Sequence, residues 1–126
     1  MTFKRLLLGR SGEDEAVRSL KKNGYRIVER NYRCRYGEID IVALDGKVIV
    51  FVEVKTRTGH GFGAPGEAVD LRKQLHIARA AQHYIAEKGV EGREARFDVV
   101  GIVGSDGRRR VELIKDAFTA DVLAID

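Results

Sequence analysis

The chain has 126 residues and a formal net charge of +4, with 44% hydrophobic and 33% charged residues. These values are typical of one globular domain, which we expect to span residues 1–118, followed by a C-terminal tail at 119–126. No apolar run approaches the ~20 residues of a membrane-spanning helix, so we expect no membrane association. The single cysteine, Cys34, excludes an internal disulfide and fits a reducing cytoplasm. The basic charge favours an anionic partner such as nucleic acid.

Residues 11–14 have the spacing of a capping box, which predicts a helix over 12–22 that ends at Asn23-Gly24. The apolar residues of this helix form one stripe: Ala16, Val17 and Leu20. Glu13 lies three, four and seven residues before them and therefore shares the buried stripe. A first-turn acid also suits the helix dipole, but that preference does not explain why Glu13 lies on the apolar side. We therefore predict a site role for Glu13.

Residues 25–36 are predicted to form the first strand, in which arginine alternates with aromatic residues over 32–36. Two interpretations of that alternation stay open. It is typical of a surface that contacts phosphates and bases, and equally of an edge strand with a solvated basic face. Cys34 has no neighbouring histidine in the sequence, so we assign it no catalytic role.

Residues 37–56 are predicted to form a β-hairpin, because Asp45-Gly46 separates two apolar, β-branched runs. A loop of those two residues places Asp40 opposite Phe51. Asp40 and Glu53 are then diagonal neighbours, roughly 7–8 Å apart at Cα.

Asp40, Glu53 and Lys55 are predicted to project from one side of this hairpin, since alternate residues of a strand share a face. Two carboxylates at this spacing, beside an ammonium group, suit a hard divalent cation and the water that it activates. The alternative is a cross-strand ion network at the end of a sheet. The expected convergence of these groups with Glu13, which comes from a helix, favours a functional site.

The segment 57–66 holds four glycines and is predicted to be either a flap over a substrate or a long connection, with His60 as a loop residue. A second helix is predicted from about residue 67 or 70 to 88, ended by Gly89. A basic helix face suits a phosphate backbone, but it also simply keeps a helix soluble. The basic residues of this helix are Arg72, Lys73, His76, Arg79 and His83.

Residues 95–103 are predicted to form a strand, joined through Asp106-Gly107 to another at 110–115. Asp98 interrupts an apolar run, and a buried charge is costly unless it is paired. We expect a structural ion pair with an arginine there, or a contact that supports the site residues. The order helix, strand, hairpin, helix, hairpin predicts an α/β fold in which a mixed central β-sheet is flanked by helices in a three-layer sandwich.

Asp40, a gap of twelve residues and then Glu53-Val54-Lys55 resemble the Asp…Glu-x-Lys signature of restriction-endonuclease-like nucleases. Longer segments across residues 5–118 resemble the YraN family of bacterial endonuclease-like proteins. These segments are Gly12-Glu13 with Ala16, Asn31-Tyr32-Arg33, Gly37-Glu38-Ile39-Asp40, residues 51–57, Phe62-Gly63, Arg96-Phe97-Asp98-Val99 and Ala117-Phe118.

The resemblance implies a restriction-endonuclease-like fold, similar to that of archaeal Holliday junction resolvases, which act as dimers on branched DNA. It also implies a site for Mg²⁺ or Mn²⁺ at Glu13, Asp40, Glu53 and the carbonyl of Val54, with Lys55 beside it. We therefore expect a metal-dependent endonuclease that hydrolyses phosphodiester bonds in nucleic acid, in DNA rather than RNA, with a homodimer as the implied assembly. Its catalytic residues would be Glu13, Asp40, Glu53 and Lys55. The alternative is a non-catalytic nucleic-acid-binding or assembly module that retains the fold.

Overall fold

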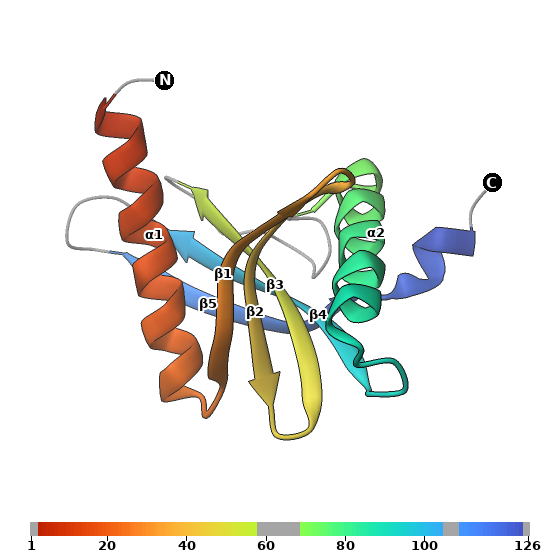
Figure 1. Ribbon diagram of the computed structural model, residues 1–126. Coiled ribbons are helices and arrows are strands. Elements are labelled where there is room, and N and C mark those ends of the chain that lie inside the picture. The colour runs from red at the N-terminus through yellow and green to blue at the C-terminus, as the bar shows by residue number, and fades with distance from the viewer. Residues whose placement is uncertain (1–2, 58–68, 105–108, 125–126) are drawn as a thin grey trace.

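The computed structural model describes residues 3–57, 69–104 and 109–124, and side chains from Gly12 onward within them. Two helices lie on opposite faces of a five-stranded sheet (Figure 1). The elements are α1 (Phe3–Lys22), β1 (Arg26–Cys34), β2 (Gly37–Asp45), β3 (Val48–Arg57), α2 (Leu71–Lys88), β4 (Ala95–Val103), β5 (Arg110–Phe118) and the short 3₁₀-helix η1 (Ala120–Ala124). The predicted three-layer α/β sandwich is therefore confirmed.

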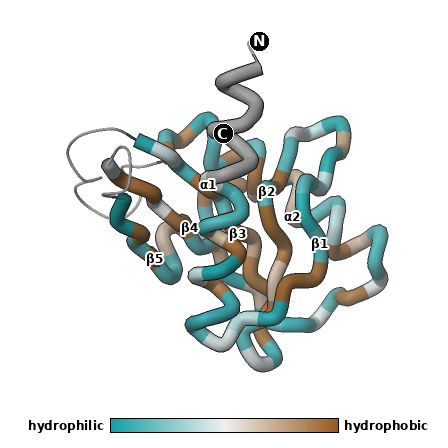
Figure 2. The backbone as a smooth tube through the Cα atoms, turned by 90° about the vertical axis from the view of Figure 1, so that its left-hand side faces the viewer, coloured by the Kyte–Doolittle hydropathy of each residue, from teal (hydrophilic) through white to brown (hydrophobic). Residues whose placement is uncertain are grey.

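The strands lie in chain order, and β3 and β4 are the parallel pair within an otherwise antiparallel sheet. Parallel neighbours need a crossover connection, and α2 belongs to it. The hydrophobic segments follow the central strands (Figure 2). Neither α1 nor α2, as far as the structure describes them, is long and apolar enough to cross a bilayer.

Each helix buries one apolar face of the sheet, because successive residues of a strand point to opposite sides. Phe51 packs on the α2 side, whereas Val50 and Val52 pack on the α1 side. The α2 side is rich in aromatic residues: Tyr32, Phe51, Tyr84, Phe97 and Phe118. The α1 side is mainly aliphatic: Ala16, Leu20, Ile41, Ala43, Val50, Val52, Val100 and Ile102.

The predicted start of the first helix is wrong, since α1 begins at Phe3 and runs through Ser11 and Gly12 without interruption. A Cβ on Gly12 would lie 2.7 Å from Oγ1 of Thr56 on β3, closer than real Cβ contacts come. The glycine therefore serves a close helix–strand approach and not a helix start. The predicted end is confirmed: Gly24 has φ 88°, and the Tyr25 N–H donates to the carbonyl of Leu20.

The predicted hairpin forms, but its register is wrong. Asp45 pairs with Val48, so the loop is Gly46-Lys47. Gly46 has φ 61°, while Lys47 is not among the positive-φ residues, which fits a turn that needs glycine at its first central position. Continuing this register by one pair beyond Ile41–Val52 brings Asp40 level with Glu53 instead of Phe51. The partner of each strand residue moves by two positions, an even shift that leaves paired residues on a common face.

The second helix and the last two strands lie where they are predicted. The Asp70 carboxylate caps α2 by accepting from the Lys73 N–H at 2.8 Å, and Gly89 ends the helix with φ 66°. Strands β4 and β5 pair antiparallel. The turn at Asp106-Gly107 and most of the glycine-rich segment, with His60, lie outside the described residues.

Candidate functional site

Asp40 and Glu53 come together at the point where strands β2 and β3 part. Their ladder ends at Ile41–Val52, and beyond it β2 continues only beside β1 and β3 only beside β4. In Figure 1 the tip of the β1–β2 hairpin leans toward α2 while β3 runs away from it. The Asp40 carboxylate occupies the fork: its Oδ2 accepts a 2.8 Å hydrogen bond from the Val54 N–H, where a main-chain carbonyl would accept in a continuing ladder.

The two carboxyl groups share a hydrogen bond, and Glu53 is buried, with only 4% of its surface exposed. Burial, the hydrogen bond with Glu53 and the negative charge of Glu53 together raise the pKa of Asp40 to about 7. The Val54 N–H and the Lys73 ammonium act in the opposite direction. Near neutral pH the pair therefore holds a proton that ordinary aspartates have lost.

Lys73 is a site residue that sequence reasoning missed. It lies in the first turn of α2, and its Nζ is 3.6 Å from Oε2 of Glu53. The sequence places Lys73 only on a basic helix face. The Asp70 cap fixes where α2 starts, but which of its basic residues lies nearest the sheet depends on how α2 packs.

Lys55 lies two residues beyond Glu53 on β3 and is partly exposed. Within the described ranges no hydrogen bond or ion pair reaches its ammonium group, in contrast to Lys73. Strand alternation keeps it on the side of Glu53. Val54, between them, contributes its N–H to Asp40.

Glu13 is largely covered, with 17% of its side chain exposed, but its partners come from β1. Its Oε1 accepts from Arg30 Nε at 3.1 Å and from Asn31 Nδ2 at 3.0 Å. The structure thus brings Asp40 and Glu53 together and leaves Glu13 engaged elsewhere, on the helix that covers the opposite face. Among the described residues no three carboxylate, imidazole or thiol side chains converge as a metal site would require.

The donor set at the fork nevertheless fits a hard divalent cation. Glu53 is buried and Asp40 is half-buried, and the neighbouring acid raises the pKa of Asp40, so a bound cation would favour the ionised form of the pair. Oxygen ligands in this pairing, with further positions filled by water, are typical of Mg²⁺ and Mn²⁺ sites. Asp40, Glu53 and the main-chain oxygen of Val54 are the groups that could hold such an ion.

Asp98 is fully buried and forms the predicted structural ion pair with an arginine. Arg96 Nε donates to its Oδ1 at 2.9 Å, and the Tyr25 hydroxyl donates to its Oδ2 at 2.7 Å. Arg96 also reaches Asp45 at 2.8 Å. Burial and the neighbouring Asp98 raise the pKa of Tyr25 above its usual range, which keeps the hydroxyl a donor. This cluster lies on the α1 side of the sheet and has no contact with the carboxyl pair.

Comparison with known proteins places the chain in one family. The model of "Uncharacterised protein family UPF0102" matches residues 12–102. The UPF0102 protein of Moorella thermoacetica is 51% identical over 94% of this chain and 100% of its own length. UPF0102 protein STH1475 of Symbiobacterium thermophilum is 53% identical over 90% of this chain and 97% of its own, and UPF0102 protein RHA1_ro06551 of Rhodococcus jostii is 46% identical over 90% and 97%. The YraN resemblance is thereby confirmed, and the chain belongs to the UPF0102 family.

Proposed function

We propose that this protein is a metal-dependent nuclease that hydrolyses phosphodiester bonds in nucleic acid. The observation that carries the proposal is the close pairing of the Asp40 and Glu53 carboxyl groups at the fork, with the Val54 N–H and the Lys73 ammonium beside them. In a structural ion network each acid is paired with a base, as Asp98 is paired with Arg96, whereas Asp40 is bonded to a main-chain N–H and to the neighbouring acid. A carboxyl group whose pKa is raised by a neighbouring acid is more typical of a functional site than of a structural ion pair.

The residues around the pair have separate roles in this proposal. Asp40 and Glu53 would hold the ion through their carboxylate oxygens, and the Lys73 ammonium, 3.6 Å from Glu53, would compete with the ion for that carboxylate. A bound Mg²⁺ or Mn²⁺ supplies a water of lowered pKa and neutralises charge on the scissile phosphate. Lys55, whose ammonium group has no described partner, orients that water or stabilises the negative charge on the phosphate oxygens. In the overall reaction a water oxygen would bond to phosphorus, the ester P–O bond would break, and one proton would pass from that water to the leaving oxygen by way of solvent.

Glu13 favours the second candidate, a nucleic-acid-binding module without turnover. Its carboxylate is already bonded to Arg30 and Asn31, so the acid pair lacks the third carboxylate implied by the family resemblance. Such a module would bind nucleic acid equally well in the presence of EDTA. The two candidates therefore differ in their dependence on metal.

A cleavage screen in Mn²⁺ tests the proposal with forked, flapped, four-way and single-stranded DNA. The wild type should cut at least one of them, and Asp40→Asn and Glu53→Gln should not. Lys55→Ala should retain Mn²⁺ binding by calorimetry while losing cleavage, and Lys47→Ala, which removes an exposed lysine from the hairpin loop, should behave as wild type. Binding that survives EDTA without cleavage of any substrate would refute the nuclease and support the second candidate.

A further inference from the structure

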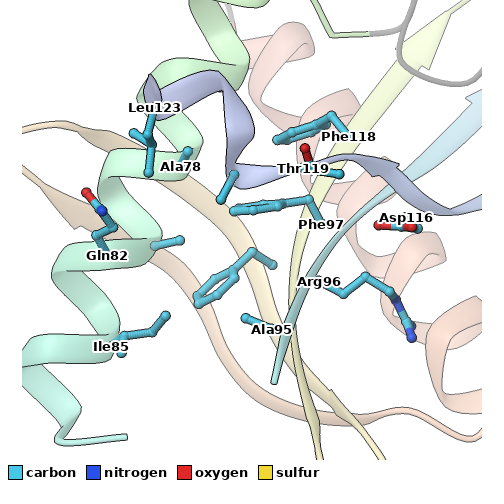
Figure 3. Close-up of a pocket in the computed structure, with 13 residues that line it drawn as sticks. Ala78, Gln82, Ile85, Ala95, Arg96, Phe97, Asp116, Phe118, Thr119 and Leu123 are labelled. Carbon is cyan, nitrogen blue, oxygen red and sulfur yellow. The ribbon is translucent and has the colours of Figure 1, made fainter. Parts of the chain in front are cut away.

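Two hollows of different chemistry lie beside α2. One, of about 210 Å³, lies between α2, β4 and η1 and is lined mainly by apolar side chains such as Phe97, Phe118 and Leu123 (Figure 3). The other, of about 300 Å³, is lined by Tyr36, Arg79, Gln82 and His83. All four carry a polar group, so this second hollow suits a polar ligand.

The polar hollow forms where the tip of the β1–β2 hairpin meets α2. Tyr36 belongs to the hairpin turn, and its ring approaches the His83 ring edge-on with centroids 6.1 Å apart. Arg35 lies over the Tyr36 ring at 4.8 Å and donates to its hydroxyl at 2.7 Å. His83 Nδ1 is hydrogen-bonded to the buried Tyr32 hydroxyl at 2.7 Å. The two rings are therefore held in place from behind.

Arg79 and Gln82 are the remaining walls, and both are exposed. Neither makes a hydrogen bond or ion pair with any other residue in the part of the chain that the structure describes. Their donors and the Gln82 carbonyl are consequently available to a ligand. A guanidinium favours a phosphate, and a carboxamide offers a donor and an acceptor to the edge of a base.

The hollow lies along the helix that also carries Lys73. Arg79 is six residues further along α2, which is about 9 Å at 1.5 Å per residue. Because six residues make about one and two-thirds turns, the two side chains also differ by about 120° around the helix axis. His76 lies between them, next to Gly37 of the hairpin.

We propose that the hollow of Tyr36, Arg79, Gln82 and His83 binds one unstacked nucleotide of a single-stranded segment adjacent to the acid pair. The inference rests on the proposed function and adds the class of substrate to it. Arg79 contacts the phosphate, Tyr36 contacts the base, and Gln82 contacts the base edge. Bases inside a duplex are stacked and cannot enter a hollow, whereas those of a single strand can turn outward onto an aromatic ring.

The test measures binding of a fluorescently labelled oligo-dT by fluorescence anisotropy in EDTA, so it does not depend on cleavage. Tyr36→Ala should raise Kd roughly 5- to 150-fold, which corresponds to the ~1–3 kcal/mol of a base–aromatic contact. Arg79→Ala should also weaken binding and lower the slope of log Kd against log salt by roughly 0.7. Tyr36→Phe retains the ring and should bind nearly as wild type does. Lys22→Ala removes an exposed charge from α1, on the other face, and should have little effect.

A blunt duplex of matched length separates this subsite from general basic attraction. Its binding should respond equally weakly to Tyr36→Ala and Lys22→Ala. Equal losses for single strand and duplex, or unchanged single-strand binding in both Tyr36→Ala and Arg79→Ala, would overturn the subsite. If the wild type cleaves DNA but these variants bind the oligonucleotide as it does, the nuclease proposal holds and the subsite is refuted. If these variants lose binding but the wild type cleaves no substrate, the subsite holds and the nuclease proposal is refuted.

Discussion

The acid pair at the fork predicts that this protein becomes less stable as the pH rises through the neutral range. The pKa of Asp40 is raised from 3.8 to about 7 in the folded protein. Between these values the folded state holds a proton that the unfolded state has lost, so raising the pH favours unfolding. The stability linked to this proton is fully present below about pH 4 and is lost as the pH rises through about 7.

Asp40→Asn isolates this contribution. Asparagine resembles the protonated acid, does not titrate, and retains an oxygen that can accept from the Val54 N–H. Raising the pKa of Asp40 from 3.8 to about 7 changes the free energy of unfolding by at most ~4 kcal/mol. The partial solvent access of Asp40 reduces the expected change to ~2–3 kcal/mol. The variant should therefore match wild type at about pH 4 and exceed its free energy of unfolding by this amount at about pH 8.

Urea denaturation in EDTA at the two pH values measures this difference, because every group that titrates alike in both proteins cancels. Asp121→Asn makes the same chemical change at an exposed position of η1 and serves as the control. Its difference from wild type should be the same at both pH values. If the Asp40→Asn difference is likewise independent of pH, the two carboxyl groups do not share a proton and the reasoning fails.

Three further predictions concern other contacts. Gly12→Ala should destabilise the protein in the wild-type background but stabilise it by up to ~1 kcal/mol in a Thr56→Ala background, because alanine favours a helix once Oγ1 is gone; urea denaturation of the four proteins measures this, and additive effects would contradict it. Asp98→Asn should lower the free energy of unfolding by ~3 kcal/mol, since Arg96 loses a fully buried partner, and an unchanged denaturation midpoint would refute that role. Lys73→Ala should tighten Mn²⁺ binding roughly two- to tenfold in calorimetry, because the ammonium competes for Glu53; weaker binding would count against the competition.

Strand alternation predicted the important part of the site, because a period of two fixes which residues share a face. Asp40 and Glu53 remain on one side although the hairpin register differs from the prediction. The register itself could not be predicted, because Asp-Gly is compatible with two loops. One loop is Asp45-Gly46, with the aspartate first, and the other is Gly46-Lys47, with the glycine first. The difference between those turns moved the two acids from a diagonal to a direct hydrogen-bonded pair.

Contacts between distant elements were less predictable. The apolar stripe of the helix indicated that Glu13 is covered. Such a stripe shows which side of the helix faces the sheet, but it does not show that the partners of Glu13 come from β1. Lys73 and Tyr36 depend on where the crossover places α2 over the sheet, and no local pattern contains that information. Asp98 was easier, because a buried charge demands a partner wherever it lies, and Arg96 is two residues away.

Asp40 also ends the pairing of β2 with β3. Its carboxylate takes the amide that would otherwise extend the pairing of β2 with β3, so a side chain decides where the sheet opens. Asp40→Ala would remove the acid and also leave the Val54 N–H without its acceptor, whereas Asp40→Asn would remove only the acid. A relative that keeps this architecture should therefore retain an oxygen-bearing residue at this position, whatever its activity.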